Sequence, residues 1–382
     1  MRVLYWTELF WPYIGGVEVL STKLIPALLE RGYEVIVVTS HDHLDLPDEA
    51  RYKGIPVYRF PFRKALATRN LHQLMEARQW VAKLKRAFAA HLVHINGVGP
   101  SSLFHLHTRE PYSVPCLVTM QNEVLPTEAA KRDTLLGDVL RSANWVTCVS
   151  AAGLAQVRQF VPEILPRSSV IYNFVNAPLL IPAPLPIDPP RLLCLGRLVP
   201  QKGFDLALRA FASLCHRFPR ARLVIAGDGP ARAALELQAA GLRLTHSVDF
   251  IGWVAPEKVP ELMNTATVVV MPSEREGFGL VALEAAMMAR PVVATRVGGL
   301  PEVVIHQQTG LLVEQEDREA LSDAIAFLLD PPEAATTMGR AGRLRAQRFF
   351  SLERLVDSYD ALYRKLIYEA AHVGASASPP PH

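Results

Sequence analysis

Short apolar runs alternate with longer amphipathic stretches along most of this 382-residue chain. Such an alternation is typical of strand–helix–strand units, in which helices cover the faces of a parallel sheet. In the first half, the strand-like runs lie at residues 3–6, 34–39, 57–60, 92–95, 117–120, 145–149 and 169–172. The pattern therefore predicts an α/β protein built on doubly wound, Rossmann-like sheets.

The alternation is interrupted at residues 177–190, where six of fourteen residues are proline. Proline lacks the backbone N–H and fixes φ, so this segment suits neither a helix nor a central strand. Strand-like runs resume at residues 191–195, 223–226, 248–251, 268–271 and 292–294. We expect Rossmann-like domains at 1–180 and 191–354, joined by a proline-rich linker at 181–190. Ligands bind at the carboxyl ends of such strands, so the cleft between the domains is the expected site.

Composition excludes several classes of protein. A net charge of +3 with 20% charged residues is too mild for a dedicated nucleic-acid binder. The four cysteines are far apart and show no metal-ligand or redox spacing. The N-terminus lacks signal-peptide features, and no apolar run approaches the roughly 20 residues that cross a bilayer. We expect a cytoplasmic protein whose tail, 375–382, is disordered.

Two glycine-rich turns follow predicted strands. Gly15 and Gly16 open a helix after the first strand, and Gly227 and Asp228 follow a strand of the second half. Glycine lets the backbone approach a ligand, and the free amides at a helix N-terminus favour anions. Both turns could therefore line a phosphate or a nucleoside, although a turn that only begins a helix would look the same.

Two cations follow the first strand of the second half. Arg197 comes directly after a glycine, and Lys202 lies five residues further on. Both should stand at the carboxyl edge of the sheet, where they could bind a diphosphate. The alternative is a solvated basic loop.

The strongest signal is the segment 271–286. A strand ends at Met271, a loop with Glu276 follows, and a helix that carries Glu284 begins near Leu280. A carboxylate beside an anion site repels the anion unless it has a role of its own. Accepting hydrogen bonds from sugar and ribose hydroxyls is such a role. The alternative is one acidic residue at a helix start and one ordinary helix glutamate. The backbone amides expected to bind phosphate belong to Gly277, Phe278, Gly279, Leu280 and Val281.

Together these segments resemble the family-four glycosyltransferases (glycosyl transferases group 1) of the GT-B fold, with a Glu-x7-Glu motif at Glu276 and Glu284. The resemblance covers nearly the whole chain. It implies that Arg197 and Lys202 hold the donor diphosphate, that Glu284 binds the ribose, and that Glu276 reaches the transferred sugar. The residues expected to act in catalysis are thus Glu276, Arg197 and Lys202.

The resemblance also implies a retaining, metal-independent transfer of a hexose-type sugar without a cofactor. The donor would be a UDP-, GDP- or ADP-sugar, and the acceptor a glycan, a lipid-linked sugar or a small molecule. A last helix near 355–370 would pack back on the N-terminal domain. Trp253 and Val254 fall in a loop expected to line the donor, but they do not indicate which nucleotide base the donor carries.

This chain departs from the family pattern after the strand at 117–120. Where the family often has a histidine, the sequence has Gln121 and Asn122, which could substitute as neutral hydrogen-bonding groups. His94 and Asn96 end a neighbouring strand and could contact either sugar. A histidine at a strand end is as often a satisfied structural group.

The segment 63–91 carries seven lysines or arginines and one glutamate, interleaved with apolar residues. It could be a basic amphipathic helix that binds the inner face of a membrane, or a solvated helix with a core stripe. Two rivals to a transferase remain open on the sequence. One is a GT-B nucleotide-sugar epimerase or phosphorylase, and the other is a non-catalytic GT-B partner subunit.

Overall fold

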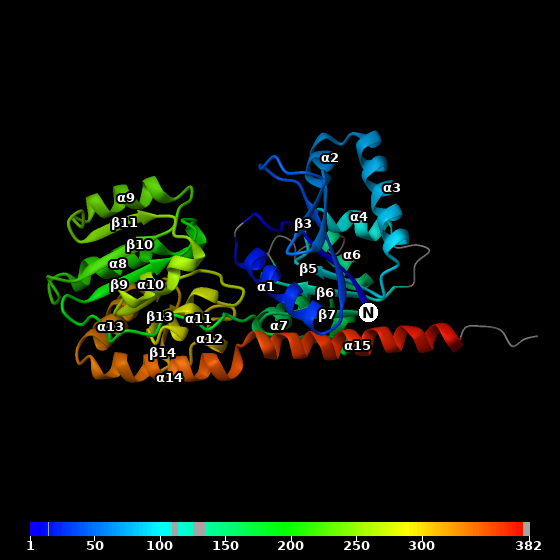
Figure 1. Ribbon diagram of the computed structural model, residues 1–382. Coiled ribbons are helices and arrows are strands. Elements are labelled where there is room, and N and C mark those ends of the chain that lie inside the picture. The colour runs from blue at the N-terminus through cyan, green and yellow to red at the C-terminus, as the bar shows by residue number, and fades with distance from the viewer. Residues whose placement is uncertain (14, 109–113, 125–133, 377–382) are drawn as a thin grey trace, which may run out of the picture. The chain divides into compact units, whose positions relative to one another are not determined.

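The computed structural model describes residues 1–13, 15–108, 114–124 and 134–376. The chain divides into two units, one formed by Met1–Tyr172 with Leu352–His382 and the other by Asn173–Ser351 (Figure 1). Within the described residues, no helix combines the length and hydropathy needed to cross a bilayer.

The first unit contains an eight-stranded sheet in the order β3-β4-β2-β1-β5-β6-β7-β8. Its strands are parallel except for the antiparallel pair β3–β4. Central strands are buried on both faces, which explains why they form continuous apolar runs. The strand bounds are β1 Arg2–Thr7, β2 Glu34–Ser40, β3 Glu49–Tyr52, β4 Ile55–Phe60, β5 Leu92–Asn96, β6 Cys116–Met120, β7 Trp145–Cys148 and β8 Ser168–Val170.

Three helices of the first unit, α3, α6 and α7, begin at a side-chain cap. Asn70, Thr134 and Ser150 each accept a backbone amide hydrogen bond at a helix start. The helices are α1 Gly16–Glu30, α2 Phe62–Thr68, α3 Leu71–Phe88, α4 Ser102–His107, α6 Leu135–Ser142, α7 Ala151–Phe160 and α15 Leu352–Ser376, with a 3-10 helix at Pro162–Arg167.

The C-terminal helix α15 belongs to the first unit and packs against α1. Arg31 forms a 2.6 Å ion pair with Asp357, and Tyr33 donates a 2.6 Å hydrogen bond to Asp360. The helix continues to Ser376, so the expectation of disorder is wrong for residues 375 and 376. The rest of the expected tail, 377–382, lies outside the described residues.

The second unit contains a six-stranded parallel sheet in the order β11-β10-β9-β12-β13-β14. Its strands are β9 Arg191–Leu195, β10 Arg222–Ala226, β11 Val248–Gly252, β12 Val268–Met271, β13 Val292–Thr295 and β14 Gly310–Val313. Its helices are α8 Phe204–Leu214, α9 Arg232–Gly241, α10 Val259–Asn264, α11 Leu280–Met287, α12 Leu300–Val303, α13 Arg318–Leu329 and α14 Glu333–Phe349, with 3-10 turns at Pro200–Lys202 and Pro256–Lys258.

The proline-rich segment is part of the second unit, which begins at Asn173, and is not a free linker. Arg290 donates a 2.7 Å hydrogen bond to the Ala183 carbonyl, and Asn264 accepts one from the Ala183 amide at 3.0 Å. Prolines therefore keep this segment out of the sheet, while polar side chains of the unit hold its backbone.

Each sheet has a point where the direction of strand order reverses. In the first unit it lies between β1 and β5, and in the second between β9 and β12. Loops that leave these strands at their carboxyl ends diverge and leave a crevice between them, which is where doubly wound sheets bind ligands. Each unit therefore has its own candidate ligand-binding edge, formed by the two loops at its switch point.

Candidate functional site

In the second unit, the loops that follow β9 and β12 are joined at the switch point. The Glu274 amide donates a 2.9 Å hydrogen bond to the Gln201 carbonyl. Gly203 has a φ of +64°, and a Cβ there would lie 1.9 Å from the Pro272 carbonyl oxygen. The close approach of the two loops therefore requires glycine at this position.

The same contact brings two predicted site residues together. The Lys202 ammonium donates a 2.6 Å hydrogen bond to Glu276 Oε2, and the two side chains are 24% and 15% exposed. A short ion pair with limited solvent access is a charge-assisted hydrogen bond that orients both groups. Arg197 is exposed in the same loop, and its guanidinium has no hydrogen-bond or ion-pair partner in the described part of the chain.

Helix α11 begins directly after the β12 loop. Its N-cap is Gly279, whose φ of +102° suits glycine and whose lack of a side chain leaves the first turn uncapped. The Glu276 carbonyl accepts a 3.0 Å hydrogen bond from the Gly299 amide, which anchors the loop. Phe278 is buried edge-on against Phe350, so it offers a ligand only its backbone.

Glu284 lies within α11. Dense surroundings raise the pKa of its carboxyl to about 7, although the residue keeps some exposure. Its carboxylate forms no hydrogen bond or ion pair with the residues that the structure describes. An acid that is costly to ionise and has no protein partner fits a group that awaits a ligand's hydroxyls.

Other predicted donor residues have mixed surroundings. Gly227 donates a 2.7 Å hydrogen bond to the Gly252 carbonyl, a contact that a structural turn would also make. Asp228 is 61% exposed and accepts from the Gly229 amide at 2.7 Å. Trp253 is 60% exposed and Val254 is partly buried, so both are accessible from solvent.

The start of α1 carries its own carboxylate. Glu18 Oε2 lies 2.3 Å from the place that a Cβ on Gly15 would take, so this acid covers the first turn of the helix. An anion at the amides of Gly15 and Gly16 would meet that negative charge. The predicted anion site therefore requires Glu18 to move.

The expectation that His94 contacts a sugar is contradicted by its surroundings. The ring is fully buried, with Nδ1 2.6 Å from the Tyr363 hydroxyl and Nε2 2.8 Å from Thr119 Oγ1. Burial lowers the pKa of His94 to about 3, so the imidazole is neutral. His94 is therefore a buried structural group, whose hydrogen bond to Tyr363 links α15 to the sheet.

Asn96 and Gln121 are brought together at the carboxyl edge of the first sheet. Gln121 Nε2 donates a 2.8 Å hydrogen bond to Asn96 Oδ1, and Asn96 Nδ2 donates to Ser21 Oγ at 3.1 Å. Asn96 is 3% exposed, so it is not open to a sugar, and Asn122 is exposed.

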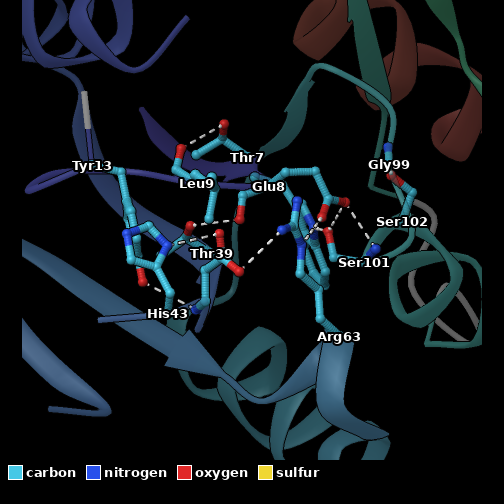
Figure 2. A network of polar contacts seen from close by, with 12 residues as sticks. Thr7, Glu8, Leu9, Tyr13, Thr39, His43, Arg63, Gly99, Ser101 and Ser102 are labelled. Carbon is cyan, nitrogen blue, oxygen red and sulfur yellow. Dashed lines mark hydrogen bonds and ion pairs between the residues drawn. The ribbon is translucent and has the colours of Figure 1, made fainter. Parts of the chain in front are cut away.

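Sequence reasoning missed a polar cluster at the switch point of the first unit (Figure 2). Glu8 follows β1, and its Oε1 accepts hydrogen bonds from the Ser101 hydroxyl at 2.6 Å and the Ser101 amide at 2.8 Å. Arg63 lies 4.0 Å from Glu8 Oε2 and 3.3 Å from Asp42. Burial raises the pKa of Glu8 despite these bonds. The available signal was position, since each residue follows a strand or begins a helix.

Comparisons with known proteins identify the family to which the chain belongs. The family model described as Glycosyltransferase Family 4 matches residues 14–179, and the model described as Glycosyl transferases group 1 matches residues 181–345. An uncharacterized glycosyltransferase, MJ1178 of Methanocaldococcus jannaschii, is 26% identical over 96% of this chain and 99% of its own length.

Two further relatives extend the comparison. A GDP-mannose-dependent α-(1-6)-phosphatidylinositol monomannoside mannosyltransferase of Mycolicibacterium smegmatis is 39% identical, over 41% of this chain and 43% of its own. The solved structure of a sucrose-phosphate synthase from Thermosynechococcus elongatus superposes with a TM-score of 0.83 at 26% identity, covering 97% of this chain and all of that one. The chain therefore belongs to the family-four glycosyltransferases of the GT-B fold and is a glycosyltransferase.

Proposed function

We propose that the protein moves a hexose-type sugar from a nucleoside-diphosphate sugar to an acceptor with retention of anomeric configuration. The observation that carries the proposal is the Lys202–Glu276 pair at the β9/β12 switch point, with Arg197 in the same loop. Cations that can bind a diphosphate thus stand beside a carboxylate that can bind hydroxyls.

The chemistry follows from these positions. The bond between the anomeric carbon and the diphosphate oxygen breaks, and a bond to the acceptor oxygen forms on the same face of the sugar. The acceptor hydroxyl gives its proton to the departing diphosphate. Arg197, Lys202 and the amides of the first turn of α11 stabilise the phosphate charge, while Glu276 faces the positive charge that develops on the sugar.

The ion pair suggests an order of events. Phosphate oxygens of the donor compete with Glu276 for the Lys202 ammonium, so donor binding exchanges one charge-assisted hydrogen bond for another. Glu276 is then released toward the sugar that it is proposed to bind. Donor entry and the orientation of the carboxylate would be coupled through one 2.6 Å contact.

We propose that neither a metal nor a cofactor takes part. Two side-chain cations and a helix N-terminus can supply the charge stabilisation that a divalent ion would otherwise give. In the parts of the chain that the structure describes, no group of three or more His, Cys, Asp or Glu side chains is placed to hold a metal ion.

The acceptor is assigned to the first unit, at the carboxyl edge of its sheet. The Arg63 guanidinium lies 4.0 Å from the Glu8 carboxylate and 3.3 Å from the Asp42 carboxylate. Hydrogen-bond donors and acceptors thus lie close together, as recognition of sugar hydroxyls requires. Gln121, at the same edge, takes the place of the histidine usual in the family and is proposed to face the transferred sugar. Arg63→Ala should weaken transfer to the acceptor and leave donor hydrolysis unchanged, with Arg69→Ala as the matched control.

Rival activities differ in what they need. An epimerase would convert a donor without an acceptor, a phosphorylase would need inorganic phosphate, and a non-catalytic subunit would show no turnover. The presence of Arg197, Lys202, Glu276 and Glu284 together supports a working transferase.

A thermal-shift screen with UDP-glucose, GDP-mannose and ADP-glucose tests the donor site. A ligand at one hundred times its Kd stabilises the folded state by about 2.7 kcal/mol. We expect a clear rise in Tm with one of the three and its loss in Arg197→Ala. If none raises the Tm of the wild-type protein, the donor assignment is wrong.

Peripheral membrane binding at the inner, cytoplasmic face is supported by one surface. Leu71 and Met75 lie one helical turn apart at the start of α3 and are 76% and 60% exposed. Basic residues of α2 and α3 flank them, a combination that suits anionic lipid. Sedimentation with phosphatidylglycerol vesicles should be lost in Leu71→Glu/Met75→Glu. Equal sedimentation with neutral vesicles, or no effect of the substitutions, would exclude this surface.

A further inference from the structure

In the first unit, a series of hydrogen bonds links three buried side chains, from Ser21 on α1 through Asn96 to Gln121. Ser21 on α1 is fully buried, Asn96 at the end of β5 is 3% exposed, and Gln121 after β6 is 9% exposed. Hydrogen bonds of 3.1 Å and 2.8 Å link them in that order. Tyr5 also reaches Ser21, with its hydroxyl 3.0 Å from Ser21 Oγ.

The direction of every hydrogen bond in this chain is determined by one carbonyl. Ser21 Oγ donates its only proton to the Val17 carbonyl oxygen at 2.8 Å, and that oxygen can only accept. The other two neighbours of Ser21 Oγ must therefore donate to it. Tyr5 donates its hydroxyl proton, and Asn96 donates through Nδ2.

The orientation of two amides follows. Because Asn96 Nδ2 donates to Ser21, Asn96 turns Oδ1 toward Gln121. An amide oxygen can only accept a hydrogen bond, so its partner on Gln121 must be a donor. Gln121 therefore gives Nε2 to Asn96. Because an amide is planar, with oxygen and nitrogen on opposite sides of the carbon, Gln121 directs Oε1 away from Asn96.

We propose that Ser21 and Asn96 are positioning residues that make Gln121 present a hydrogen-bond acceptor to a hydroxyl of the transferred sugar. This inference rests on the proposed function, in which Gln121 faces that sugar. A neutral oxygen held in one orientation selects a hydroxyl that can donate. A reversed amide would present N–H groups to the same hydroxyl, so the orientation sets which contact the site makes.

The first test reads the amide directly and does not depend on activity. In ¹⁵N-labelled protein, the side-chain NH₂ signals of Gln121 are identified by their loss in Gln121→Ala. Ser21→Ala removes the acceptor that holds Asn96, so these signals should shift or broaden. Tyr5→Phe is the matched control, because it removes a buried hydroxyl from the same Ser21 oxygen yet leaves Asn96 oriented, so the signals should stay in place. Unchanged signals in Ser21→Ala would overturn the inference.

The second test is a kinetic cycle on hydrolysis of the nucleotide sugar that the thermal-shift screen selects. Ser21→Ala should lower kcat about tenfold with little change in KM, as expected for loss of about one hydrogen bond. Tyr5→Phe should keep kcat within about twofold even if its Tm falls. In a Gln121→Ala background, Ser21→Ala should cause no further loss.

The outcomes distinguish failure of the positioning role from failure of the proposed transferase function. Losses that multiply in the double variant would show that Ser21 acts independently of Gln121, and a loss in Tyr5→Phe equal to that in Ser21→Ala would show a merely structural role. Either result overturns the inference while the transferase activity stands. A wild-type protein that turns over none of the three nucleotide sugars contradicts the proposed function instead, and the amide signals still decide whether the orientation is as described.

Discussion

Glu284 offers a prediction in which stability and function change in opposite directions. Its surroundings on α11 raise the pKa of the carboxyl from the ordinary 4.5 to about 7. A tenfold change in proton affinity is worth about 1.4 kcal/mol, so keeping this group ionised costs about 3 kcal/mol. Partial exposure makes this an upper value. Glu284→Gln keeps the shape and removes the charge.

The raised pKa of Glu284 makes the stability of the protein depend on pH. Between pH 4.5 and 7 the folded protein still holds the proton that the unfolded chain has released. The folded state then binds more protons, so the free energy of unfolding falls as pH rises through this window. The stability gained by Glu284→Gln should therefore be near zero at pH 4.5 and grow to about 3 kcal/mol at pH 8.

Urea unfolding at pH 5 and pH 8 measures this difference. Glu319→Gln, on an exposed side chain of α13 in the same unit, is the matched control and should change stability little at either pH. The same Glu284→Gln variant should bind the donor more weakly, because a carboxylate accepts hydrogen bonds from ribose hydroxyls more strongly than an amide does. An equal stability difference at both pH values would refute the buried-charge argument.

Three further outcomes follow from the donor site. Arg197→Ala and Lys202→Ala should each raise the donor KM and lower kcat, by about 2 to 4 kcal/mol in kcat/KM, because charge on the leaving diphosphate is left uncompensated; near-normal donor kinetics in both would remove them from the site. Glu276→Gln should act mainly on kcat, whereas Glu284→Gln should act mainly on KM, and steady-state kinetics of the two side by side distinguish these roles; wild-type kcat in Glu276→Gln would exclude that residue. Turnover should survive EDTA, and loss of activity that only a divalent ion restores would show that a metal supplies the charge assigned here to Arg197 and Lys202.

Much of the fold follows from local pattern, because strands buried on both faces must be apolar along their whole length. The strands missed by the sequence analysis are short. Residues 49–52 alternate between exposed and partly buried at the sheet edge, and residues 310–313 follow a polar turn with little to mark them. The proline-rich segment was correctly expected to lack helix and strand, but its attachment through Arg290 depends on side chains far away in sequence.

For the candidate site too, local features could be predicted from the sequence, whereas contacts between distant segments could not. Glycines and charges mark the loops that follow strands, so the sequence itself indicates Arg197, Lys202, Glu276 and Glu284 as candidates. Contacts between distant segments could not be predicted, and the role of His94 depends on Tyr363, 269 residues further along the chain. The Glu8 cluster was missed because single polar residues after strands form no motif, and only the fold brings them together.

The central claim is retaining transfer from a nucleotide sugar, and the first-formed sugar anomer tests it most directly. In the absence of an acceptor, slow hydrolysis of an α-linked donor can be followed by ¹H NMR, in which the α and β anomeric protons of the released hexose are resolved before mutarotation mixes them. The account predicts that the α anomer accumulates first together with the nucleoside diphosphate, and that both are lost in Lys202→Ala. First accumulation of the β anomer would contradict retention, and release of sugar that is unchanged in Lys202→Ala would contradict the site.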